Sequence, residues 1–426
     1  MRLLIIGASG FIGHAACRAL RGAGHDVLGM APDVERARRT SPDVFWVAAD
    51  PLEIRTVKEW EFHLRNMDVV LYVNRAEQKG AEAFDPSFDA LLQAAENCNV
   101  KRLVKLTTTG QSADGIPRCR GARRVEQALQ NSGLDWVILR PGLVIGPGVN
   151  DSLALLRLGA SLPGMLPQID RGARVQTISL NDLLVAIDDA VSGRLPVRRS
   201  YDLVEADIWT AKQLTSRFRT WLGLPRVHRV VRLPEFVLNS ALVVGQGLEK
   251  IGWRTPLGNR ALGAMLEGIQ GDATDYIKAT GHHISSFDES LNQVPATTQE
   301  RWYTRFYLFF PVIIALMSIV LVGAAITGFF SGTIPLLPWQ GFDGNSTVLT
   351  VLGMVLQLVF MTVGLGIVWP RFSRIASYGV LGLCTLYGLI GVAPMPESWG
   401  APVVIYSTIL PLFVLAWLIC MMLESK

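Results

Sequence analysis

The sequence predicts a doubly wound parallel α/β sheet, followed by an all-α bundle of four membrane-spanning helices. Two observations carry this prediction. The first 140 residues alternate short apolar runs with stretches of helical period, a pattern typical of a parallel sheet with helices on its faces. From residue 306 onward, four long apolar runs follow one another. We therefore expect three parts: a sheet domain at 1–150, a smaller α/β part at 151–300 and a membrane domain at 301–426.

The chain opens on a strand, a glycine-rich turn and a helix. An apolar run at 3–6 precedes the spacing G-x-x-G-x-x-G, and a helical stretch at 14–21 follows it. In such a unit the first glycine makes a tight turn, the second lets the backbone approach a pyrophosphate, and the third lets helix and strand pack closely. Backbone N–H groups and the helix dipole then face the phosphate. The unit predicts a dinucleotide site formed by Gly7, Ser9, Gly10, Phe11, Ile12 and Gly13.

The next elements continue the alternation of strand and helix. Strands are expected at 26–30, 44–48, 68–73, 102–107 and 136–139. Helices are expected at 84–97 and at 118–132, the second closed by Gly133. Beyond the sheet, helices are expected at 180–191 and 210–222. Since helices separate successive strands, the strands should pair in parallel and place their carboxyl ends at one edge.

Several short motifs resemble the short-chain dehydrogenase/reductase superfamily, in its extended or atypical branch that includes epimerase-like and NmrA-like proteins. They are the glycine turn, Asp50 after the third strand, Lys105-Leu106-Thr107-Thr108 and Leu139-Arg140-Pro141-Gly142. The resemblance extends over roughly residues 1–295. It implies a Rossmann domain that binds NAD or NADP, with a small α/β domain that covers the substrate. It also implies that Asp50 and its neighbour Pro51 contact the adenine.

The choice between NAD and NADP depends on the end of the second strand. An acidic residue there would bind the ribose 2′-hydroxyl, and an arginine would suit a 2′-phosphate. The strand ends Met30-Ala31-Pro32, and arginines stand nearby at positions 36, 38 and 39. These arginines indicate either a phosphate clamp that includes Arg36 or a solvated helix face. The sequence favours NADP slightly.

The usual catalytic pair of this superfamily is absent. The resemblance implies a Tyr-x-x-x-Lys pair on the helix after the fifth strand, but alignment on 125–129 places Arg118 and Ala122 at those positions. Arginine stays protonated and is a poor general acid at neutral pH. Arginines at 118, 120, 123 and 124 surround Cys119. They are compatible with a solvated basic face, with anion binding, or with a reactive Cys119 of lowered pKa. Thr108 is a further candidate, as a hydroxyl for substrate or as a cap of the strand end.

The region 151–300 carries a basic run before an apolar helix. Arginines at 217, 219, 226, 229 and 232 and His228 precede a helical pattern at 235–253 that has few charges. Such a pattern is typical of contact with lipid headgroups, and equally of a helix buried under the substrate domain. His282 and His283 are adjacent without a supporting cluster of cysteines or carboxylates, so we expect no metal site.

The four apolar runs lie at 306–330, 347–369, 375–392 and 403–423. About 20 residues span a bilayer. Arginines flank the runs at 301, 305, 371 and 374, whereas the loops at 331–346 and 394–400 contain no lysine or arginine. By the positive-inside rule both termini are cytoplasmic, at a membrane of the bacterial inner type. The stretch 299–307 resembles the start of a DoxX-like domain, which implies a four-helix membrane bundle.

Composition excludes several classes. A net charge of +4 does not indicate a nucleic-acid partner, and five cysteines without a C-x-x-C spacing indicate neither a disulfide framework nor zinc. The N-terminus lacks the pattern of a signal peptide. We interpret the chain as a membrane-anchored NAD(P)-binding protein that acts as a redox sensor or as an accessory subunit of a membrane redox complex. The alternatives are an active oxidoreductase or epimerase on a lipid-like or quinone substrate, and a structural protein.

Overall fold

The computed structural model divides the chain into two compact units. The first comprises Met1–Pro234 and Arg260–Thr297, and the second comprises Glu235–Asn259 and Thr298–Lys426. The residues that the structure describes are 1–73, 86–107, 117–147, 151–168, 173–225, 229–232, 236, 240, 243, 247, 253, 268–331, 347–391 and 400–424.

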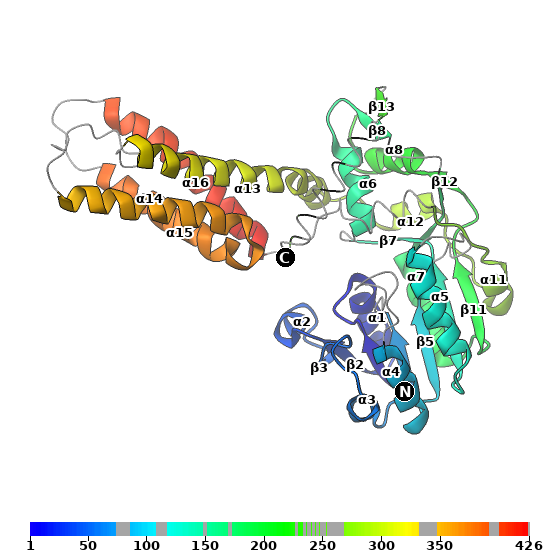
Figure 1. Ribbon diagram of the computed structural model, residues 1–426. Coiled ribbons are helices and arrows are strands. Elements are labelled where there is room, and N and C mark those ends of the chain that lie inside the picture. The colour runs from blue at the N-terminus through cyan, green and yellow to red at the C-terminus, as the bar shows by residue number, and fades with distance from the viewer. Residues whose placement is uncertain are drawn as a thin grey trace. The chain divides into compact units, whose positions relative to one another are not determined.

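The described part of the first unit is built on a seven-stranded parallel sheet (Figure 1). Its order is β11-β6-β5-β4-β1-β2-β3, and each neighbouring pair is parallel. The predicted parallel sheet is thereby confirmed. The strands are β1 (Arg2–Ile6), β2 (Asp26–Ala31), β3 (Phe45–Ala48), β4 (Val69–Tyr72), β5 (Arg102–Leu106), β6 (Trp136–Pro141) and β11 (Arg199–Leu203).

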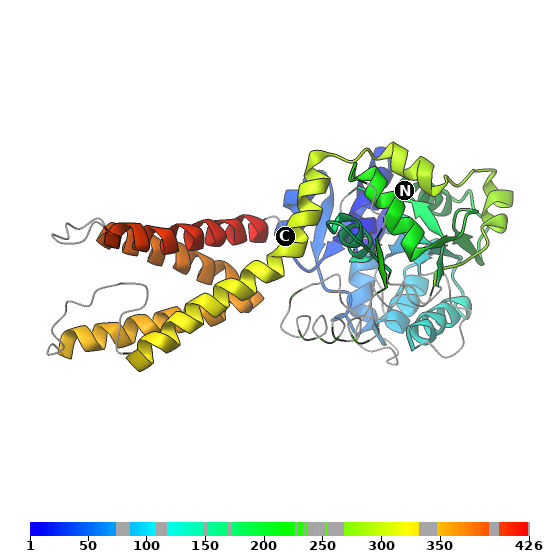
Figure 2. The same cartoon turned by 90° about the horizontal axis from the view of Figure 1, so that it is seen from above.

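Helices cover both faces of this sheet (Figures 1 and 2). On β1, Leu3 and Ile5 face one core with α1 (Phe11–Gly22), α2 (Val34–Thr40) and α7 (Leu180–Ser192). Leu4 and Ile6 face a second core with α3 (Val57–Leu64), α4 (Pro86–Asn97) and α5 (Pro117–Gln130). Because β1 is apolar on both faces, it is read correctly from sequence as a fully buried strand.

The remaining elements of the first unit form small ribbons and helices. The strands pair as β7 (Leu143–Ile145) with β10 (Thr177–Ser179), β9 (Arg174–Val175) with β12 (Trp209–Thr210), and β8 (Leu166–Gln168) with β13 (Val230–Arg232). The helices are α6 (Asp151–Ser161), α8 (Ala211–Trp221), α11 (Thr274–Thr280) and α12 (Phe287–Gln293). Although β11 follows residue 150, it completes the edge of the main sheet beside β6.

Most element boundaries differ from expectation by one or two residues, and α1 differs more. We expected this helix from His14, but it begins at Phe11, with extended backbone at its N-cap, Gly10. The prediction missed the first turn because it assigned all residues up to Gly13 to the glycine-rich turn. In the structure Gly13 is required there by packing, as described below.

The second unit contains four long helices: α13 (Thr298–Ser331), α14 (Thr347–Val368), α15 (Pro370–Gly391) and α16 (Gly400–Glu424). Each packs on the next, and α16 also packs on α13. Trp253 joins them, since its Nε1 donates to the Val368 carbonyl at 2.6 Å and its ring meets Phe310 edge-on. Among the described residues, one stretch, Phe309–Phe330, is long and apolar enough to cross a membrane, whereas Met354–Val368 and Ile409–Leu423 are shorter apolar helices.

Candidate nucleotide-binding site

The glycine turn forms a compact bend between β1 and α1. Gly7 has a φ of 84°, which favours glycine, and its carbonyl accepts from the Gly10 N–H at 3.1 Å. A Cβ on Gly13 would lie 2.1 Å from the Gly7 oxygen and 2.9 Å from the Ala8 Cα. Helix α1 therefore packs directly on the backbone of the turn. With no acidic residue in its first turn, its N-terminus can attract an anion.

This turn lies where the strand order reverses. β1 pairs with β2 on one side and with β4 on the other, and the chain crosses from one half of the sheet to the other there. Ligands of doubly wound sheets bind outside the carboxyl ends of the strands at such a point. Ser9 and Gly10 are exposed there, and Phe11 and Ile12 are half-buried. The turn therefore has both the position and the backbone geometry of a pyrophosphate cradle.

Hydrogen bonds to Asp50 and Pro51 hold the loop after β3 in place. Asp50 accepts from the Leu52 N–H at 2.9 Å, and the carbonyl of buried Pro51 accepts from the Ser87 hydroxyl at 2.6 Å. The first bond forms a local turn around the aspartate, and the second ties the loop to the start of α4. Asp50 keeps a half-buried side chain near the carboxyl end of the sheet, where an adenine contact is expected.

Residue Arg36 lies in the first turn of α2, directly after β2, and its side chain is exposed. The structure adds a residue that sequence reasoning missed. Asp33 caps α2 by accepting from the Arg36 N–H at 3.0 Å. An acidic and a basic residue therefore stand together after β2. The signal in the sequence was Pro32-Asp33 before a helical stretch, a pattern typical of an N-cap.

The catalytic candidates lie largely outside the described residues. Thr108 belongs to the part of the chain that is not described, and Arg118 and Cys119 are described only as backbone positions of α5. Arg118 and Ala122 are four residues apart on this helix and so share a face. The threonine before Thr108, Thr107, is buried, and its N–H donates to the Leu139 carbonyl at 3.0 Å. Its backbone therefore extends the pairing of β5 with β6 by one residue.

An ion-paired chain fixes the orientation of α5. Buried Glu126 of α5 accepts from Arg140 of β6, with Nη2 at 2.6 Å from Oε2 and Nε at 3.3 Å from Oε1. Arg140 also lies 3.7 Å from Asp202 of β11. Although burial alone would lower the pKa of Arg140, the two carboxylates raise it. The helix that carries Arg118 and Cys119 is thereby anchored to two strands.

A buried lysine beneath this edge was also missed as a site residue. Lys105 of β5 is 1% exposed, and its ammonium lies 4.5 Å from the centre of the Tyr72 ring. Ile6, Tyr72 and Lys105 stand in register on three neighbouring strands; Ile6 and Tyr72 are the last residues of β1 and β4, and Lys105 is the last but one of β5. A fully buried lysine is rare unless it is paired. The signal in the sequence was a charged residue inside the apolar run Leu103-Val104-Lys105-Leu106.

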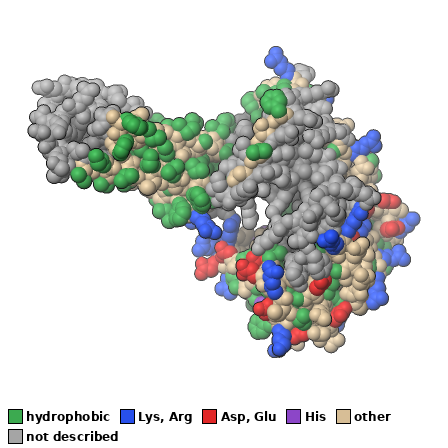
Figure 3. All heavy atoms as spheres, in the orientation of Figure 1, with side chains coloured by type: hydrophobic (Ala, Val, Ile, Leu, Met, Phe, Trp, Pro, Cys, Tyr) green, Lys and Arg blue, Asp and Glu red, His purple; other side chains and the backbone are tan. Residues whose placement is uncertain are grey.

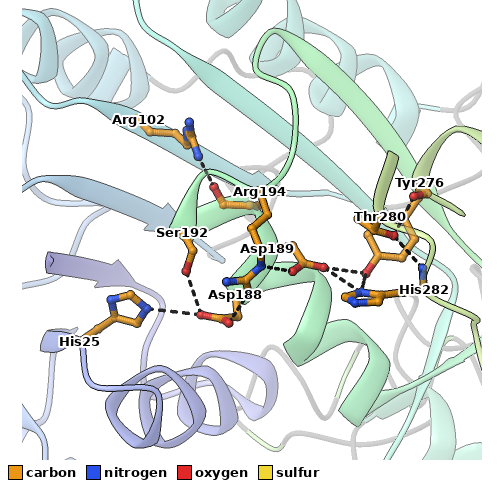
Figure 4. A network of polar contacts seen from close by, with 10 residues as sticks. His25, Arg102, Asp188, Asp189, Ser192, Arg194, Tyr276, Thr280 and His282 are labelled. Atoms are coloured by element: carbon orange, nitrogen blue, oxygen red, sulfur yellow. Dashed lines mark hydrogen bonds and ion pairs between the residues drawn. The ribbon is translucent and has the colours of Figure 1, made fainter. Parts of the chain in front are cut away.

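A separate polar network lies at the end of the sheet opposite to the glycine turn (Figure 4). Buried Asp189 of α7 receives Arg194 Nε at 2.6 Å, His282 Nδ1 at 3.0 Å and the Tyr276 hydroxyl at 3.2 Å. Burial, followed by the charge of Asp189, raises the pKa of Tyr276. Since Arg102 opens β5 and His25 precedes β2, this network lies at the amino ends of the strands, away from the glycine turn. It joins α7, α11 and the loop after α11.

The two adjacent histidines therefore have different partners. His282 bonds to Asp189, and His283 lies 3.9 Å from Glu289. Across the described residues, no group of three or more His, Cys, Asp or Glu side chains is arranged to hold a metal ion.

Comparison with known proteins bears on the first unit. Residues 7–152 match the profile of the NAD(P)H-binding family. The N-terminal module is an NAD(P)-binding Rossmann domain. Uncharacterized proteins of Mycobacterium tuberculosis and Mycobacterium bovis are 27% identical over 258 residues, which is 59% of this chain and 28% of theirs. The match thus spans little more than a quarter of those relatives.

Solved structures share the fold of this domain. The NADPH-dependent quinone oxidoreductase of Escherichia coli, complexed with NADPH, is 18% identical, with a TM-score of 0.53 over 69% of this chain and 99% of that one. The UDP-glucose 4-epimerase of Thermotoga maritima, with UDP-glucose, is 15% identical, with a TM-score of 0.52 over 72% and 100%. At such identities the similarity concerns the fold alone.

Proposed function

We propose that the chain is a membrane-anchored NAD(P)H-binding protein that reports or uses the redox state of the cofactor at the cytoplasmic face of a membrane, as a sensor or an accessory subunit. The observation that carries the proposal is a complete glycine turn upstream of a helix that has Arg118 and Ala122 in place of the usual pair. Binding without ordinary hydride chemistry is what this combination supports. We retain the division into parts at 1–150, 151–300 and 301–426 within the proposal.

The membrane part of the proposal is supported by the surface of the helical unit. Figure 3 shows hydrophobic atoms over the described face of these helices, whereas charged side chains gather on the α/β unit. On α13, Phe310, Met317 and Leu321 are buried, but Phe309, Leu316 and Ile319 are exposed, so the helix is apolar all round. A helix that is apolar on every side is buried or lies in lipid. We propose that α13–α16 all span the membrane as a DoxX-like bundle, with both termini cytoplasmic.

A second candidate function is an active oxidoreductase or epimerase on a quinone or lipid-like substrate. Lys105 favours it, because this buried lysine lies near the carboxyl end of β5, whereas Ala122 stands at the position of the usual lysine on α5. The E. coli relative in fold is named for quinone reduction with NADPH. In this candidate the protein is an enzyme. The positive charge near its cofactor comes from Lys105 of β5 and not from a lysine of α5.

One experiment separates the two candidates. The full chain in nanodiscs is titrated with NADPH and NADH by fluorescence, and cofactor oxidation is then followed with quinones and lipid aldehydes. Binding without turnover supports the sensor. Turnover that Lys105→Met abolishes while cofactor binding persists supports the enzyme. Failure to bind either cofactor at millimolar concentration contradicts both candidates and leaves a structural role.

We expect Arg36 to set the choice of cofactor in favour of NADP. Its exposed guanidinium lies in the first turn of α2, where a 2′-phosphate would meet the helix N-terminus. Arg36→Ala should weaken NADPH binding about tenfold, which is ~1.4 kcal/mol, and leave NADH binding unchanged. Asp33→Asn should not weaken NADPH binding.

The matched control is Arg65→Ala, which removes an exposed arginine at the end of α3, just before β4. It should change neither affinity. Two results together would contradict this role of Arg36: the wild type prefers NADH, and Asp33→Asn loses NADH binding. They would show that Asp33 and not Arg36 contacts the ribose.

A further inference from the structure

The strongest unexplained surface in the first unit is the ribbon formed by β8 and β13. Met165, Val230 and Val231 are 41%, 38% and 40% exposed. They are contiguous, because Val230 pairs with Leu166 and the Leu166 N–H donates to the Arg229 carbonyl at 2.9 Å. Successive strand residues face opposite sides, so Val230 and Val231 expose apolar surface on both faces of the ribbon.

The two strands of the ribbon differ in burial. Leu166 and Pro167 of β8 are buried, and β8 packs against α6 and α8. β13 is the outer strand, and within the described strands it pairs only with β8. An outer strand with two exposed valines is a surface that soluble proteins normally avoid or use for binding.

The charge around the ribbon is mostly positive, although Asp170 follows β8 and Glu235 follows β13. Residues 223–234 contain Arg226, Arg229 and Arg232 and no acidic residue, and residues 161–168 contain no charged residue. Arg229 is exposed. Two other arginines of the predicted headgroup-binding run are engaged elsewhere: Arg217 pairs with Asp288 at 3.0 Å, and Arg219 donates to the Ala160, Leu162 and Pro225 carbonyls. We therefore restrict the predicted contact with lipid headgroups to the arginines around β13.

The chain then leads from the ribbon into the helical unit. Only Leu233 and Pro234 separate Arg232 from Glu235, where the second unit begins. That segment, Glu235–Asn259, reaches the bundle through Trp253, which contacts the carboxyl end of α14 and Phe310 of α13. The same end of the bundle carries Arg301 and Arg374, so by the positive-inside rule it faces the cytoplasm. On the segment, Phe236 and Val243 are helical, seven residues apart and exposed.

We propose that the β8–β13 ribbon docks on the cytoplasmic surface of the bilayer that holds the bundle. Met165, Val230 and Val231 enter the boundary between headgroups and acyl chains, and Arg229 binds the phosphates of anionic lipids. The proposal rests on the membrane anchoring proposed above. Its ligand is a lipid surface of negative charge, and its effect is to hold the nucleotide-binding unit against that surface.

The test places a fluorescent label at Val231→Cys in the full chain, reconstituted in vesicles that contain nitroxide-labelled lipids. Cys98, Cys119, Cys384 and Cys420 are replaced by serine, and Cys17 stays unlabelled because burial raises the pKa of its thiol to about 12. Ile277→Cys is the control for an exposed site of the same unit, at 42% exposure, and Ile319→Cys of α13, at 67%, reports insertion of the bundle. Cofactor titration of each variant verifies that the first unit is folded.

The proposal is supported if the label at residue 231 is quenched much more than the label at residue 277. This quenching should be stronger with anionic than with neutral lipids. Arg229→Ala should shift the docked fraction about fivefold toward release, whereas Arg217→Ala, which removes a paired arginine, should not. Equal quenching at 231 and 277, with strong quenching at 319, overturns the ribbon proposal and leaves the bundle in the membrane. The absence of quenching at all three sites overturns both.

Discussion

Replacing Gly13 with alanine should abolish binding of NADPH and NADH by the full chain. A Cβ at this position would lie 2.1 Å from the Gly7 carbonyl oxygen, and no movement of a neighbouring side chain can relieve this clash, since the atom it meets belongs to the backbone. The helix would have to move away from the turn by about 1 Å, and its N–H groups would no longer converge on the pyrophosphate. We expect a loss of affinity of at least about 100-fold, which is ~2.7 kcal/mol, by fluorescence titration.

The same helix supplies the control. A Cβ on Gly22, at the other end of α1, would meet nothing within 4 Å. Gly22→Ala should therefore bind both cofactors normally and unfold at an equal or higher temperature. If Gly13→Ala keeps the affinity of the wild type, the phosphates bind somewhere other than the glycine turn, and the proposed site is wrong.

Replacing Glu205 should produce the largest loss of stability in the first unit. This carboxylate is 1% exposed and accepts from the Thr177 N–H and hydroxyl, the Trp209 indole N–H and the Phe287 N–H, at 2.5–3.1 Å. Glu205 thereby links β10, β12 and the start of α12. Glu205→Ala would leave four buried donors without an acceptor, and we expect a loss of about 3–5 kcal/mol. Thermal unfolding of the full chain in nanodiscs measures it.

The pH dependence provides a second readout of Glu205. Burial raises its pKa above the ordinary value of 4.5, against the opposing effect of its four donors. Because the folded state holds the proton more tightly than the unfolded state, this group contributes most stability below the ordinary pKa. That contribution is lost as the pH rises through the raised pKa. Glu205→Gln removes this titration and also turns one acceptor into a donor.

We expect Glu205→Gln to lose about 2 kcal/mol at low pH and less as the pH rises. The matched control is Asp207→Asn, which changes an exposed carboxylate two residues away. It should leave the free energy of unfolding unchanged at every pH. A constant difference between wild type and Glu205→Gln across pH would contradict the raised pKa.

The sequence predicted the sheet well because its signals are local. The apolar runs of β1 and β4 and the glycine spacing each lie within a few neighbouring residues. Residues whose role depends on distant partners were not predicted. Glu205 receives donors from positions 177 and 287, and the ribbon joins strands that are more than 60 residues apart in the chain. Nothing local marks such contacts.

The candidate site was predicted in part for the same reason. The turn from Gly7 to Gly13 is a local motif, so its geometry follows from its spacing. Lys105 and Asp33 are single residues whose position becomes informative only once strand register and helix capping are known. The roles of Thr108, Arg118 and Cys119 remain predictions from the sequence. Assigning them requires the binding and turnover measurements described above.

The division of the chain into units has a consequence for how the protein is made. The polypeptide passes between the two units three times, at 234–235, 259–260 and 297–298. A ribosome therefore releases the segment 235–259 before the first unit has received α11 and α12, and before any helix of the bundle exists. Trp253 must wait unpaired until α13 and α14 have been synthesised. Maturation of the cofactor domain and insertion of the bundle are thus interleaved in time, and a fragment cut at residue 297 would keep a tryptophan-bearing segment without its docking partner.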